Sequence, residues 1–152
     1  NLLDSHDVSR FLSLCGGDTA GYRLAVLFMM CFVGMPTVFY GDELGVQGIR
    51  EEEYRAPMPW ETGNLSLLAF FRKAIAMRHA LAPLREGDFR VLSAETGSRV
   101  FCFRRCIEKE SVTVAINAGD APAVLPFTWE KIYWAEGFRD GTLFPGGFAV
   151  LP

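Results

Sequence analysis

The sequence of 152 residues has no basic run, no apolar run of membrane length and few histidines and cysteines. Its 15 Lys and Arg are scattered and are outnumbered by 18 Asp and Glu, which argues against a nucleic-acid surface. The longest apolar stretch, residues 24–36, is interrupted by Gly34 and falls short of the ~18 residues needed to span a bilayer. We therefore expect neither nucleic acid nor a membrane as a partner.

Cysteine and histidine are scarce, with four and two residues respectively. The spacing of Cys102 and Cys106 matches no zinc motif, so we expect no metal site, and no motif indicates a cofactor. Reduced thiols and a cytoplasmic location are our expectation. The first residues, however, read like the interior of a domain, so the lack of a signal peptide says nothing about the parent protein.

The composition, 50% hydrophobic and 22% charged with 13 phenylalanines, is that of a globular protein. Residues 1–4 are interpreted as the end of a strand. Asp18 is placed to cap a helix that runs to Val33 and has almost no polar side, so it should be buried on more than one face. Residues 36–40 form a continuous apolar run typical of a buried parallel strand. An amphipathic helix, capped by Asn64, is predicted over residues 65–81.

The pattern changes after Pro83, from helical spacing to short β-rich runs separated by turn residues. These runs predict an antiparallel sandwich or curled sheet. The predicted strands cover residues 88–93, 98–105, 111–117, 123–127, 132–134 and 147–151. We expect one domain over residues 1–83 and a second over 84–152, so the fold class is α/β followed by all-β.

Charged residues follow both apolar runs of the first half. His6, Asp7 and Arg10 follow the first run, where an α/β enzyme places side chains at the mouth of its sheet. Arg10 is interpreted as orienting Asp7 or the neighbouring loop. Asp42 and Glu43 follow the run 36–40; since adjacent residues on an extended chain point apart, they are interpreted as loop-fixing groups, with Glu43 accepting from backbone amides.

Three segments resemble the α-amylase family of glycoside hydrolases. The run Leu3-Asp4-Ser5-His6-Asp7-x-x-Arg10 is similar to that family's last conserved region. Residues 34–43, GMPTVFYGDE, resemble its eighth barrel strand, and residues 55–60, RAPMPW, resemble its Arg-x-Pro-Met-x-Trp segment. The most similar branch is that of neopullulanase, cyclomaltodextrinase and maltogenic amylase. The resemblance implies the last two βα units of a (β/α)8 barrel followed by a C-terminal antiparallel β-sandwich.

The resemblance also implies roles. Asp7 matches the carboxylate that stabilises the transition state, His6 a residue that bonds sugar hydroxyls, and Arg55 a residue that contacts a more distant sugar. Glu51 stands where the family has Asp, which displaces the carboxylate by about one bond length. The implied substrate of the parent enzyme is an α-glucan oligosaccharide, cleaved with retention by a nucleophile and a general acid about 5 Å apart. Both lie on strands four and five, outside this sequence, so we expect the chain alone to be inactive.

Other interpretations stay open at this stage. The chain could belong to a non-catalytic amylase-like subunit, although His6, Asp7 and Arg55 together argue against that. The β half could be a carbohydrate-binding module, with Trp129 and Trp134 as sugar platforms. The first half, two βα units without the rest of a sheet, should self-associate.

Overall fold

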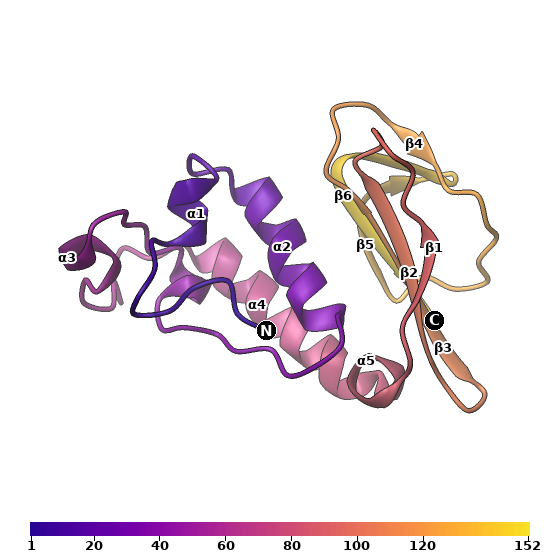
Figure 1. Cartoon of the computed structure of the whole chain (residues 1–152), viewed down its shortest axis with the longest axis horizontal. Helices are drawn as coiled ribbons and strands as arrows, with labels where there is room; N and C mark the ends of the chain where they lie inside the picture. Colours follow the sequence, from indigo (N-terminus) through magenta and orange to yellow (C-terminus); the bar gives the residue numbers. More distant parts are fainter. The chain divides into compact units, whose positions relative to one another are not determined.

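The computed structural model describes residues 1–152, which form two compact units (Figure 1). One unit comprises residues 1–30 and 34–77, and the other comprises residues 31–33 and 78–152. The helices are α1 (Phe11–Leu14), α2 (Thr19–Cys31), the 3-10 helix η1 (Asp42–Leu44), α3 (Glu51–Tyr54), α4 (Leu65–Ala80) and α5 (Ala82–Glu86). None of them is both long and apolar enough to cross a bilayer.

The two long helices begin at the predicted caps. The Asp18 carboxylate accepts a hydrogen bond from the Ala20 N–H at 2.9 Å, and the Asn64 side chain accepts one from the Leu67 N–H at 3.0 Å. Buried side chains occupy most of α2, as its lack of a polar stripe predicted. On α4 the buried face is Leu67, Phe70, Phe71, Ala74 and Met77.

The predicted strand over residues 36–40 is wrong for this chain. Only one isolated parallel bridge forms, between Leu2 and Thr37, with the Thr37 N–H donating to the Asn1 carbonyl at 2.7 Å. Val38 and Tyr40 are 36% and 40% exposed, although both were expected to be buried. A parallel strand needs hydrogen-bonding neighbours along its edges, and only the segment around Leu2 pairs with this run.

The second unit contains one antiparallel sheet of six strands. They are β1 (Arg90–Ser93), β2 (Val100–Ile107), β3 (Glu110–Asn117), β4 (Ala123–Val124), β5 (Trp134–Arg139) and β6 (Thr142–Leu151). Their order is β1-β2-β3-β6-β4, and β5 also pairs with β6. The sheet curls because β6 pairs with β3 through its second half and with β4 through its first residues.

Several strand boundaries differ from the prediction: β4 ends at Val124 instead of residue 127, and the last two strands differ most. Strand β6 starts at Thr142 instead of residue 147, and β5 extends from Trp134 to Arg139. The Pro145-Gly146-Gly147 segment, whose residue types favour a turn, lies inside β6 opposite a register shift in β5. A Cβ on Gly147 would lie 2.6 Å from the Gly137 carbonyl oxygen, so this close backbone approach requires glycine.

The sheet has two differently covered faces. Cys102, Ala115, Leu125, Leu143, Ala149 and Leu151 form a buried cluster on one face. On the other, the fully buried Arg105 donates to four backbone carbonyls at 2.8–2.9 Å, those of Cys31, Leu84, Gly87 and Asp88. Burial lowers the pKa of Arg105. No sequence pattern indicates this role, because all four acceptors are backbone atoms.

Candidate functional site

Four of the residues singled out from the sequence lie together on the first unit. The His6 imidazole lies 3.2 Å from the Asp7 carboxylate, and both side chains are 69% exposed. Arg55 donates from Nε to the His6 carbonyl at 2.9 Å, and its Nη2 lies 3.7 Å from Asp7 Oδ1. Arg55 Nη1 pairs with Glu51 Oε1 at 2.7 Å. The arginine therefore connects two segments that are 44 or more residues apart in the sequence.

The short helix α3 places Glu51 and Arg55 next to each other. Residues four apart on a helix lie on the same side, so the two side chains meet. The Glu53 carboxylate accepts hydrogen bonds from the Ile49 and Arg50 N–H groups at 3.0 and 3.1 Å. These bonds and the Arg50 guanidinium lower the pKa of Glu53 to about 2. Helix α3 is absent from the elements predicted from the sequence.

A buried ion pair anchors the segments that carry the exposed cluster. Arg10 and Asp42 are 0% and 2% exposed, and Arg10 Nη1 donates to Asp42 Oδ1 at 2.8 Å. Arg10 Nε donates to the Tyr54 carbonyl at 3.1 Å, and the Arg10 N–H donates to the Gly48 carbonyl at 2.8 Å. Arg10 therefore holds the segment that carries α3.

Asp42 and Glu43 differ in their hydrogen bonds to the loop. The Phe39 N–H donates to Asp42 Oδ2 at 2.9 Å, whereas the buried Glu43 Oε2 has no hydrogen-bond partner. Burial, followed by a hydrogen bond and repulsion from the Asp4 carboxyl, raises the pKa of Asp42 to about 8, against the opposing effects of Phe39 and Arg10. Asp4 itself accepts from the Phe11 N–H at 2.6 Å.

The exposed cluster offers polar groups to a ligand. Asp7 can accept hydrogen bonds from hydroxyls or stabilise a nearby positive charge, and Arg55 Nη2 lies beside it. No group of three or more His, Cys, Asp or Glu side chains could hold a metal ion. Trp60, which is 78% exposed, follows α3 and has a free indole face. The arrangement suits a neutral, hydroxyl-rich ligand better than an anion.

Known proteins resemble almost the whole chain. The sequence model of the family described as "Alpha amylase, catalytic domain" matches residues 1–139. Neopullulanase 2 of Thermoactinomyces vulgaris is 42% identical over 128 residues, which are 82% of this chain and 22% of that protein. A cyclomaltodextrinase of Bacillus sp is 39% identical over 119 residues, which are 77% of this chain and 21% of that protein.

A solved structure is also similar to this chain. That of the debranching enzyme from Nostoc punctiforme superposes with a TM-score of 0.86 at 31% identity, over 99% of this chain and 34% of that one. The chain spans about a fifth of the length of the curated relatives it matches. With a family match over residues 1–139, this chain belongs to the α-amylase family of glycoside hydrolases, and its relatives include neopullulanase and cyclomaltodextrinase.

Proposed function

We propose that the chain is the C-terminal part of a retaining α-glucan hydrolase or transglycosylase that acts on starch-, pullulan- or cyclodextrin-type substrates. It would supply the last two βα units of the (β/α)8 barrel, and its curled sheet would be the counterpart of the C-terminal β-sandwich. The observation that carries the proposal is the Arg55 side chain, which joins His6, Asp7 and Glu51 in one exposed cluster.

Each residue of the cluster has a chemical role in this proposal. The transition state resembles an oxocarbenium ion, so an ionised Asp7 beside the sugar ring would stabilise its positive charge. His6, fixed next to Asp7, would bond hydroxyls of the same sugar. Arg55 would contact a sugar farther along the glucan. Glu51 reaches Arg55 at 2.7 Å in spite of its extra methylene, so the ion pair that orients Arg55 is retained.

The chain alone would not cleave a glucan. Retaining cleavage requires a nucleophile and a separate general acid. Asp7 is a single carboxylate and cannot fill both roles. The nucleophile and acid would come from barrel strands four and five of the parent enzyme. The exposed runs around Met35 and Val38 would be covered by that barrel, and in its absence the first unit would self-associate.

Assays of the chain and of the complete enzyme test these statements. The purified chain should release no reducing sugar from pullulan or cyclodextrin. In the complete enzyme, the substitution corresponding to Asp7→Asn should lower kcat by at least about a hundredfold, because the lost charge acts in the transition state. The exposed Glu52→Gln is the matched control and should leave kcat unchanged. A complete enzyme that keeps full kcat without the Asp7 charge would refute the role of Asp7.

A further inference from the structure

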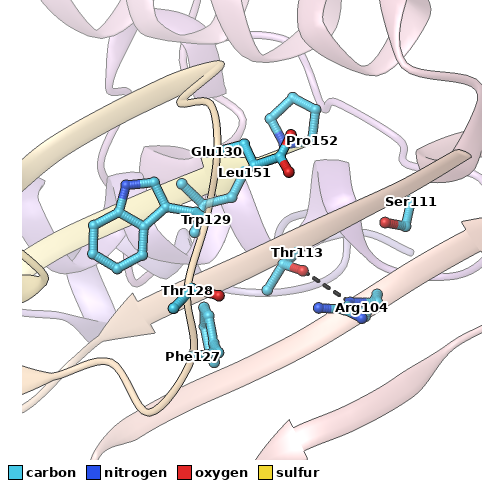
Figure 2. A pocket seen from close by; sticks show the side chains of 9 residues that line it. All are labelled: Arg104, Ser111, Thr113, Phe127, Thr128, Trp129, Glu130, Leu151 and Pro152. Atoms are coloured by element: carbon cyan, nitrogen blue, oxygen red, sulfur yellow. Dashed lines mark hydrogen bonds between the residues drawn. The ribbon is translucent and has the colours of Figure 1, made fainter.

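A pocket of about 390 Å³ opens on the second unit, whereas the His6–Asp7 cluster belongs to the first unit. Figure 2 shows Arg104, Thr113 and Ser111 projecting from strands β2 and β3, with the segment of residues 127–130 lying over the sheet. Arg104 is paired in register with Thr113, and Thr113 with Leu151, so these three residues form one row across three strands.

Alternation along β2 separates this pocket from the buried arginine of the other face. Neighbouring residues of a strand point to opposite sides, so Arg104 faces away from the four backbone carbonyls that bind Arg105. Its row lies beside the buried cluster that contains Cys102 and Ala115. Phe127 and Trp129 pack against that cluster, and Trp129 makes an edge contact with Phe138 at 5.1 Å between ring centroids. The pocket wall is therefore backed by a packed core.

The polar groups of the pocket have unused hydrogen-bonding capacity. The only hydrogen bond among them joins Arg104 Nε to Thr113 Oγ1 at 3.0 Å (Figure 2). Arg104 and Glu130 line the same pocket with opposite charges, yet no ion pair joins them. The terminal guanidinium nitrogens can donate, the Glu130 carboxylate can accept, and the Thr128 hydroxyl can do both.

The balance of groups indicates the class of ligand. The Glu130 carboxylate offsets the positive charge of Arg104, which disfavours a phosphate or another anion. A sugar hydroxyl can donate to Glu130 while a neighbouring hydroxyl accepts from Arg104, and both bonds are then charge-assisted. The volume lies within the range of small-ligand sites, about 300–1,000 Å³.

We propose that this pocket binds a short segment of an α-glucan, as a second carbohydrate site separate from the cluster at Asp7. The choice of an α-glucan among neutral sugars rests on the proposed function. Such a site would hold a polymer or long oligosaccharide on the enzyme between cleavage events, and it would raise the effective concentration of substrate chains. It contains no group of the cluster around Asp7.

The test is an NMR titration of the isotope-labelled 152-residue chain with maltotetraose up to about 20 mM, enough to detect a millimolar Kd. We expect saturating shifts of the amides of Arg104, Thr128 and Glu130. Arg104→Met and Glu130→Gln should each weaken this binding about tenfold or more, the loss expected for one charge-assisted hydrogen bond. The exposed Arg139→Met and Glu95→Gln are the matched controls and should bind like the parent chain.

The outcomes separate this site from the proposed function. No saturating shift at the pocket, or shifts that Arg104→Met and Glu130→Gln leave unchanged, would overturn the second site. Equal binding of cellobiose would overturn its assignment to α-glucans. Asp7→Asn should not change the pocket titration, so a failure of the catalytic proposal in the complete enzyme is detected independently. Unchanged amide spectra outside the substituted residue show that each variant is folded.

Discussion

Removing the Arg10 guanidinium should cost a large share of the stability of the helical unit. Arg10→Leu keeps an apolar side chain but leaves the Asp42 carboxylate buried beside Asp4 without a cation. It also removes the bond to the Tyr54 carbonyl and the guanidinium stacked 4.3 Å from the Phe39 ring. Breaking a buried ion pair from one side costs about 3–5 kcal/mol, against a total of about 5–15 kcal/mol for a typical domain.

Urea unfolding at pH 9 measures this loss, because the folded pKa of Asp42 is about 8 and its carboxyl is mostly ionised there. Circular dichroism at the helical band follows the transition, since α2 and α4 carry most of the helix in the chain. The double variant Arg10→Leu/Asp42→Leu removes the buried charge together with its partner. It should recover at least about 2 kcal/mol relative to Arg10→Leu alone, because paired charges replaced by apolar groups are often neutral. The exposed Arg72→Leu on α4 is the control for the loss of one arginine. A cost below about 1 kcal/mol for Arg10→Leu, or a double variant no more stable than the single one, would refute the anchor.

Three further predictions concern titration and packing. Because the folded pKa of Asp42 lies above its ordinary value of 3.8, its contribution to stability is present at low pH and is lost as pH rises from about 4 to 8; urea midpoints should therefore fall over this range and fall less in Asp42→Asn. Glu53 is the opposite case, with a folded pKa of about 2, so its contribution is present above the unfolded pKa and lost as pH falls through 2. Glu53→Gln should loosen α3 at pH 7, seen as faster amide exchange at Ile49 and Arg50, and the difference from the parent chain should shrink as pH falls toward 2. Gly147→Ala should lower the melting temperature of the sheet, because its Cβ would meet three carbonyl oxygens within 2.6–3.0 Å and overpacking costs about 1–3 kcal/mol. Gly119→Ala controls for the loss of a glycine, since its Cβ would meet only side-chain atoms, at 3.1 and 3.3 Å; an equal effect in both would contradict the close approach at Gly147.

The sequence by itself determined the elements that depend on near neighbours. Asp18 and Asn64 bond amides two and three residues away, so the starts of α2 and α4 were predictable. Alternation and turn residues similarly placed β2 and β3 to within two residues. The family motif singled out His6, Asp7 and Arg55 as a set, and family resemblance does not depend on the geometry of this one chain.

Tertiary structure alone decided the features that depend on distant partners. Residues 36–40 have the composition of a strand, but a strand forms only where neighbouring backbone pairs with it, and one bridge to Leu2 is insufficient. The partner of Arg10 is Asp42, 32 residues away, and no spacing rule connects them. The Pro145-Gly147 segment became part of β6 because Gly137 lies against it. In each case the deciding contact joins atoms far apart in the chain, and local sequence patterns carry no information about such contacts.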